Sequence, residues 1–142
     1  RVALTSILVM QPKVLVLDEP TSQMDPIGTR EVFGTIRTMA EQGMTVILVE
    51  HKMEWIANFA DRVVALHEGQ ILLEGKPQEV LTSDLLLDKG FGISRYTSVA
   101  RRAKELGLWK KKQLPVTLEE AVDGFAFDLT PNPSPKGEGS KR

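Results

Sequence analysis

The sequence predicts an α/β fold in which a parallel sheet carries a βαβ unit and is followed by a β-hairpin and small helices. Two apolar runs, 14–17 and 45–49, are bounded by turn signals, which is typical of strands buried on both faces of a parallel sheet. A helical pattern separates the two runs, and parallel strands need such a crossover. Farther along, Glu68-Gly69 joins two short runs, 62–66 and 70–74, and predicts the hairpin.

Composition narrows the class of protein before any motif is considered. The chain has 142 residues, 42% of them hydrophobic, and a formal charge of -1, which describes one soluble globular domain of ordinary size. That charge supplies no overall basic field, so we expect no nucleic-acid partner. The chain contains no cysteine, which excludes disulfides and thiol catalysis. No apolar run reaches the roughly 18 residues that span a bilayer, and no signal peptide is recognisable.

The first half of the chain shows helix and strand signals in alternation. A helical pattern before Pro12 precedes the strand at 14–18, and Asp25-Pro26 reads as an N-cap with proline at the first helical position. Gly43 supplies the stop of that helix. A second helix is expected at 52–60, after the second strand. The inner faces of the three helices are expected to carry Val2, Ala3, Ser6, Ile7 and Met10, then Ile36, Met39 and Ala40, then Trp55, Ile56, Phe59 and Ala60.

The second half is expected to hold short helices and a tail. After the hairpin, helices are predicted at 78–81 and at 84–88, the latter capped by Ser83 or Thr82 and closed by Gly90. A longer helix ending at Gly107 would bury one face. A capping box of Thr117 with Glu120 predicts another helix start. The tail 130–142 is expected to be disordered, and it is either functional or non-native coding sequence. The longer helix is expected to bury Tyr96, Val99, Ala100, Ala103 and Leu106.

The end of the first strand carries the most informative chemistry. Asp18 and Glu19 are adjacent carboxylates at the carboxyl end of a parallel strand, where open α/β sheets place their ligands. Two such groups repel each other unless a cation or a shared proton offsets them. A hard metal ion with a phosphate ligand therefore fits this position, which indicates a nucleoside-triphosphatase site. Taken alone, the pair is equally compatible with a solvated turn.

The ordered set of motifs resembles the C-terminal half of an ATP-binding-cassette (ABC) ATPase, over about residues 1–123. Val14–Glu19 looks like the Walker B strand, Thr21–Pro26 like the D-loop, and Val49-Glu50-His51 like the switch-histidine segment. Gly69–Ile71 and Gly75–Val80 match the hairpin and the ending of that domain. The resemblance implies a partial P-loop NTPase fold over residues 1–82, a helical extension over 83–123 and a disordered tail over 124–142.

The resemblance also implies roles for four residues and two cofactors, ATP and Mg²⁺. Asp18 would bind Mg²⁺ through its water shell, because this ion dehydrates reluctantly. Glu19 would polarise the attacking water as a base or positioning group. His51 would contact the γ-phosphate and hold Glu19. Asp25 would couple two ATP sites across a dimer interface. Without the resemblance, Asp25 indicates only a helix N-cap and His51 only an ordinary histidine.

Several parts of the family's site are absent from these 142 residues. No Gly-x-x-x-x-Gly-Lys-Ser/Thr loop occurs, and neither does the Leu-Ser-Gly-Gly-Gln signature, after which Arg1–Leu4 would follow directly. Because the chain begins with Arg1 rather than Met, a truncated gene product is the expected explanation. We therefore expect this chain alone to bind ATP negligibly and to hydrolyse none. Its uncovered apolar faces and sheet edge predict poor stability or aggregation.

The region after the hairpin resembles the tail of energy-coupling factor ATPases, through Phe91-Gly92-Ile93 and Leu114–Ala121. This implies a cytoplasmic, peripheral membrane subunit that pairs with a second ATPase, identical or different, and docks on transmembrane subunits to power uptake of a vitamin or metal ion. Two alternatives stay open, a DNA-repair or chromosome-maintenance ATPase and an inactive remnant. The run Lys110–Lys112 reads as a solvated linker face or, alternatively, as a contact to anionic lipid.

Overall fold

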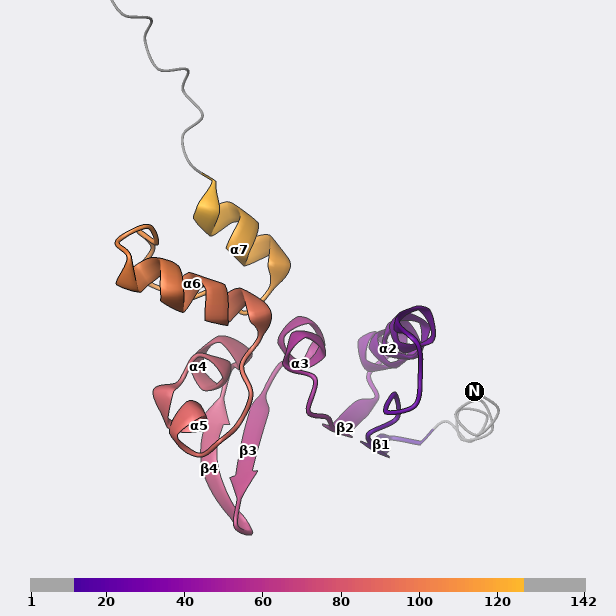
Figure 1. Cartoon of the computed structure of the whole chain (residues 1–142). Coiled ribbons are helices and arrows are strands. Elements are labelled where there is room, and N and C mark those ends of the chain that lie inside the picture. Colours follow the sequence, from indigo (N-terminus) through magenta and orange to yellow (C-terminus); the bar gives the residue numbers. More distant parts are fainter. Residues whose placement is uncertain (1–11, 127–142) are drawn as a thin grey trace, which may run out of the picture.

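Residues 12–126 are described in the computed structural model, so the expected helix before Pro12 and the tail 130–142 lie outside the described part. Figure 1 shows a βαβ unit at one side of the molecule and a hairpin with small helices at the other. The elements in chain order are β1 Val14–Asp18, α2 Pro26–Glu41, β2 Thr45–Val49, α3 Met53–Phe59, β3 Val63–His67, β4 Gln70–Gly75, α4 Pro77–Leu81, α5 Asp84–Asp88, α6 Arg95–Glu105 and α7 Leu118–Phe125.

The predicted βαβ unit is confirmed. β1 and β2 pair in parallel, from Val14 opposite Thr45 to Asp18 opposite Val49, and α2 is the crossover. Asp25 caps α2 and Pro26 occupies its first turn, as expected. The chain leaves the helix through Gly43 at φ +94°, a conformation that favours glycine. The core between sheet and helix consists of Leu15, Leu17, Val32, Ile36 and Met39.

Two burial predictions for this unit were wrong. The strands are buried on one face only, because α2 covers that face and nothing in residues 12–126 covers the other. Ala40 is exposed, since its place on α2 lies one residue beyond the buried Met39. The uncovered side chains alternate along the two strands as period-2 geometry requires. They are Val14, Val16, Ile47 and Val49, each 52–64% exposed.

Aromatic rings connect α2 to α3. Phe33 of α2 is completely buried and stacks on Trp55 at a centroid distance of 4.6 Å. Phe59 closes the group at 4.9 Å from Phe33. Such pairs contribute about 0.5–1.5 kcal/mol beyond the area they bury. The predicted apolar side of the 52–60 segment is therefore confirmed. Trp55 and Phe59 pack against Phe33 of α2, while Ile56 and Ala60 pack against the hairpin core.

The predicted hairpin is also confirmed. β3 and β4 pair antiparallel through a turn in which Glu68 and Gly69 both have positive φ, +50° and +77°, as a type I′ turn requires. The predicted short helices α4 and α5 lie beside the hairpin, α5 being capped by Ser83. The core they share consists of Val63, Ala65, Val80, Leu81, Leu86 and Val116.

The helical pair α6 and α7 forms a third small core with Ala100, Ala103 and Trp109. The predicted burial of Val99 and Leu106 was wrong, for they are 58% and 60% exposed. The helix instead turns Thr97 inward, where the Thr97 hydroxyl donates to the Pro115 carbonyl at 2.7 Å. Small inward residues let the following segment approach the helix closely. The predicted capping box of Thr117 and Glu120 starts α7.

Candidate functional site

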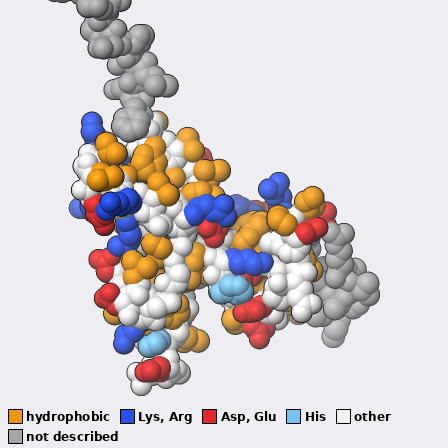
Figure 2. Space-filling model, viewed as in Figure 1, with side chains coloured by type: hydrophobic (Ala, Val, Ile, Leu, Met, Phe, Trp, Pro, Cys, Tyr) orange, Lys and Arg blue, Asp and Glu red, His pale blue; other side chains and the backbone are white. Residues whose placement is uncertain are grey.

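The carboxyl ends of β1 and β2 bring two polar segments together. Asp18 is the last residue of β1 and Glu19 follows it, while Glu50 and His51 follow β2, and the parallel register sets these ends side by side. Figure 2 shows a histidine beside acidic side chains at the surface over β1 and β2. The Glu19 amide continues the ladder by donating to the Val49 carbonyl at 3.0 Å. Parallel strands present their ligands at this edge. The edge is therefore the candidate site of the described residues.

Glu19 and His51 are in direct contact. His51 Nδ1 lies 3.1 Å from Glu19 Oε1, and both side chains remain open to solvent, 64% and 47% exposed. Glu19 has a φ of +40°, in the left-handed region that glutamate rarely adopts. Holding a non-glycine residue there costs of order 1–3 kcal/mol, and residues of this kind cluster at functional sites. The strained backbone turns Glu19 out of the strand alternation and toward His51.

A buried polar layer lies beneath this pair and was not anticipated from the sequence. The Glu50 side chain is only 1% exposed and accepts hydrogen bonds from the Thr21 hydroxyl and from two backbone amides. Lys52 Nζ donates to the Thr21 carbonyl at 2.9 Å and to its hydroxyl at 3.3 Å. The sequence signal for this layer was the position of Glu50 directly after an apolar strand. A carboxylate can be buried at such a position only where hydrogen-bond donors surround it.

Asp18 and Asp25 take different positions from that pair. Asp18 is exposed at the last position of β1, and no hydrogen bond or ion pair joins Asp18 or Asp25 to Glu19 or His51 within residues 12–126. Asp25 accepts from the Gly28 amide at 2.6 Å and caps α2. The structure therefore brings Glu19 and His51 together, leaves Asp18 beside them at the strand end, and uses Asp25 as a helix cap.

The donor set fits a magnesium ion held mainly by water and phosphate. No cluster of three or more His, Asp or Glu side chains that could enclose a metal ion occurs in the described range 12–126. Mg²⁺ usually keeps several waters and binds through one or two carboxylates together with substrate phosphates. The exposed Asp18 carboxylate at the strand end satisfies that requirement.

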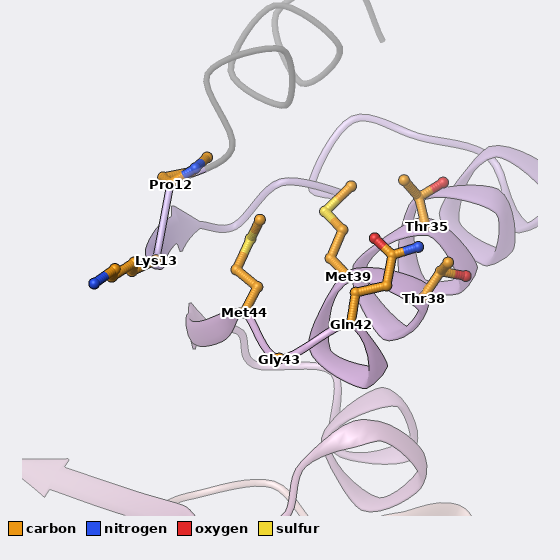
Figure 3. Close-up of a pocket in the computed structure, with 8 residues that line it drawn as sticks. All are labelled: Pro12, Lys13, Thr35, Thr38, Met39, Gln42, Gly43 and Met44. Atoms are coloured by element: carbon orange, nitrogen blue, oxygen red, sulfur yellow. The ribbon is translucent and has the colours of Figure 1, made fainter.

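A shallow pocket lies elsewhere, at the amino end of β1 and the carboxyl end of α2 (Figure 3). It is therefore at the opposite end of the βαβ unit from Glu19 and His51. No carboxylate or histidine lines it, so it offers none of the groups that bind a metal or activate water. Its lining residues are Pro12, Lys13, Thr35, Thr38, Met39, Gln42, Gly43 and Met44.

Sequence comparison relates the chain to known ATP-binding proteins. It is 45% identical over 121 residues to the energy-coupling factor transporter ATP-binding protein EcfA2 of Streptococcus pyogenes serotype M5 (strain Manfredo), and the same figure holds for the serotype M3 strain SSI-1 protein. The match covers 84% of this chain and 43% of the relative. The chain thus spans less than half the length of the curated relatives it matches. No protein-family model matches the chain.

Solved structures give the same relationship at the level of the fold. CbiO1 from Clostridium perfringens, described as part of the ABC transporter complex cbiONQ, matches with a TM-score of 0.52 and 33% identity over 75% of this chain and 39% of that one. MJ1267, an ATP-binding cassette of an ABC transporter in its ADP conformation, matches with a TM-score of 0.58 and 25% identity over 64% of this chain and 37% of that one. No helix within residues 12–126 is long and apolar enough to cross a membrane.

Proposed function

Because this chain is a relative of the energy-coupling factor ATP-binding proteins and has part of the ABC ATPase fold, we propose that it forms the metal-binding and water-activating half of an ATP-hydrolysing site. The observation that carries the proposal is the 3.1 Å contact between Glu19 and His51 at the carboxyl edge of a parallel strand pair. The residues that resemble the Walker B strand and the switch histidine are far apart in sequence, and the fold places them in contact.

Asp18 and Glu19 have separate tasks in this proposal. Asp18 would hold Mg²⁺ through water, and the ion, when bound, neutralises charge that develops on the phosphates. Glu19 would accept hydrogen bonds from the attacking water and orient it toward the γ-phosphate. The two tasks suit their surroundings, since Asp18 is exposed at the strand end whereas Glu19 is fixed by its ladder hydrogen bond and by His51.

His51 would link Glu19 to the γ-phosphate, and the protonation of its two ring nitrogens limits how it does so. A carboxylate accepts only, so Nδ1 must carry the proton in the contact with Glu19. A neutral ring then has no proton on Nε2, the nitrogen available to a phosphate oxygen. The ring can therefore hold Glu19 while neutral, and it can donate to both groups at once only as an imidazolium.

The whole protein would work as an ATPase subunit at the cytoplasmic face of a membrane. A second ATPase subunit would complete the nucleotide site, and Asp25 would lie near that interface while capping α2. Transmembrane subunits would couple closure and opening of the ATPase pair to uptake of a vitamin or metal ion. A phosphate-binding loop is absent from the 142 residues, so the chain alone would be inactive.

A chimera tests the proposal. Residues 12–126 would replace the matching segment of the Streptococcus pyogenes relative, and ATP hydrolysis would be measured. Glu19→Gln should lower kcat by at least about 100-fold, the smaller contribution expected of a general base. Glu68→Gln is the matched control, because Glu68 is also an exposed glutamate with a positive φ but lies in the turn of the hairpin. A chimera that folds and binds ATP but hydrolyses none, or a Glu19→Gln variant with full kcat, would refute the proposal.

A further inference from the structure

A buried carboxylate joins the segment after β1 to the segment after β2. Glu50 Oε1 accepts from the backbone amides of His51 and Lys52 at 3.0 and 3.1 Å, within its own segment. Glu50 Oε2 accepts from the Thr21 hydroxyl at 3.1 Å, across to the other segment. Thr21 is fully buried and the Glu50 side chain is 1% exposed. The Glu50 side chain therefore links the two loops at the candidate site.

The direction of each hydrogen bond in this layer follows from the groups involved. Lysine only donates and an ionised carboxylate only accepts, so the single hydroxyl between them has one possible arrangement. The Thr21 hydroxyl accepts from Lys52 Nζ and donates to Glu50 Oε2. Lys52 thus offsets the charge of Glu50 through the hydroxyl rather than by direct contact. Charge-assisted bonds of this kind are about twice as strong as neutral ones.

This layer fixes the position of His51. The His51 amide is held by Glu50 Oε1, and its ring nitrogen Nδ1 lies 3.7 Å from that oxygen and 3.1 Å from Glu19 Oε1. The ring therefore stands between an exposed carboxylate and a buried one. The same layer holds the turn that follows Glu19, since Thr21 receives two bonds from Lys52.

We infer that Glu50, with Thr21 and Lys52, is a positioning unit that keeps His51 Nδ1 against Glu19 by locking the two loops together. Removal of the Thr21 hydroxyl leaves a buried carboxylate oxygen without its donor, which loosens the link between the loops. The importance of this lock for ATP hydrolysis rests on the proposed function, but the lock itself is a property of residues 19–52 and can be measured without nucleotide.

The test follows the ring nitrogens of histidine by ¹⁵N NMR in the full chain, at a pH where the rings are neutral. His51 is expected as the Nδ1–H tautomer. Thr21→Val and Glu50→Gln should shift its tautomer ratio toward Nε2–H by about 2-fold to 10-fold, the range for one hydrogen bond. Thr21→Ser keeps the hydroxyl and should restore the wild-type ratio. Thr97→Val is the matched control, since Thr97 is equally buried but lies in α6.

Amide hydrogen exchange provides a second measurement, because it separates a local loosening of the two loops from unfolding of the whole chain. Faster exchange confined to 19–24 and 50–52 in Thr21→Val supports the lock. Four results would overturn it. The tautomer ratio of His51 could stay unchanged in Thr21→Val, or it could shift equally in Thr97→Val. The wild-type ring could be in the Nε2–H form, or amide exchange in Thr21→Val could rise as much in the hairpin as in the two loops. An Nε2–H ring would also remove the hydrogen bond assigned to His51 in the proposed function, and the Glu19→Gln variant of the chimera then tests that function separately. The other three results would leave the proposed function standing, because the chimera assay reports on Glu19 directly.

Discussion

Replacement of Gly124 is expected to destabilise the α6–α7 unit, because the Trp109 ring lies where a side chain at position 124 would begin. A Cβ at position 124 would lie 1.8 Å from Cη2 of the Trp109 ring, 2.3 Å from Cζ3 and 2.7 Å from Cζ2. Trp109 is 6% exposed, and its Nε1 donates to the Gln113 carbonyl at 3.0 Å, so the ring has no free space to move into. Phe125 packs against it edge-on at 4.9 Å.

Two opposing effects set the change in unfolding free energy caused by Gly124→Ala. Ala in place of Gly within a helix stabilises it by up to about 1 kcal/mol. Overpacking of a well-filled core costs about 1–3 kcal/mol, and an overlap with a rigid ring belongs at the upper end. The α6–α7 unit should therefore lose about 2 kcal/mol in Gly124→Ala, which corresponds to about 30-fold faster amide exchange in α7.

Hydrogen exchange of the full chain measures this effect locally. Gly34 in α2 is the matched control, because nothing lies within 4 Å of its added Cβ. Gly34→Ala should slow exchange in α2 by about fivefold, the gain from helix propensity alone. In Gly124→Ala, exchange in α2 should stay at the wild-type rate. Unchanged or slower exchange in α7 of Gly124→Ala would refute the packing argument.

Three further outcomes are expected. Calorimetric titration of the 142-residue chain with Mg-ATP should show negligible heat of binding, and tight binding would contradict the assignment of phosphate binding to a segment outside this sequence. Heating of the chain alone should give aggregation or a broad transition because apolar strand faces are uncovered, and a sharp cooperative transition would contradict this. Burial raises the pKa of Glu54, but backbone hydrogen bonds and the side chain of Arg95 outweigh this and hold it below its ordinary value of 4.5. The ionised Glu54 carboxylate therefore stabilises its contact with α6 at pH values above 4.5, and this stabilisation is lost as the pH falls through the lowered pKa of Glu54. Arg95→Gln should make the loss at acid pH smaller, which amide hydrogen exchange of α6 over roughly pH 3–6 would measure.

Local signals were enough to predict most of the elements. Asp25-Pro26, Gly43, Glu68-Gly69 and Thr117 each act within a few residues, so caps and turns could be read from the sequence. Burial depends instead on what covers each face. The strands were expected to be buried on both sides, but only the side facing α2 is covered, and the inward face of α6 is decided by a hydrogen bond from Thr97 to a residue outside that helix.

The candidate site divides in the same way. Glu19 and His51 were predictable because both follow apolar strands, and parallel strands meet at their carboxyl ends. The burial of Glu50 was missed, because it depends on hydrogen-bond donors from Thr21 and from the backbone of its own turn, and the sequence does not show that Thr21 lies beside Glu50. The positive φ of Glu19 was equally hidden, because a sequence contains no sign of strain that the surrounding contacts impose.

The uncovered face of the βαβ unit is the same face that bears Asp18. Side chains alternate along β1, so Val14, Val16 and Asp18 point to one side, and Val49 stands opposite Asp18 in the register. Whatever covers Val16 and Val49 must therefore also pass beside Asp18. Under the proposed function, burial of these valines and completion of the metal site would be one event, so that the apolar contact, worth about 25 cal/mol per Å² buried, stabilises the assembled site. Glu19 departs from this alternation through its positive φ and contacts His51 instead, so the Glu19–His51 contact is already formed before that event.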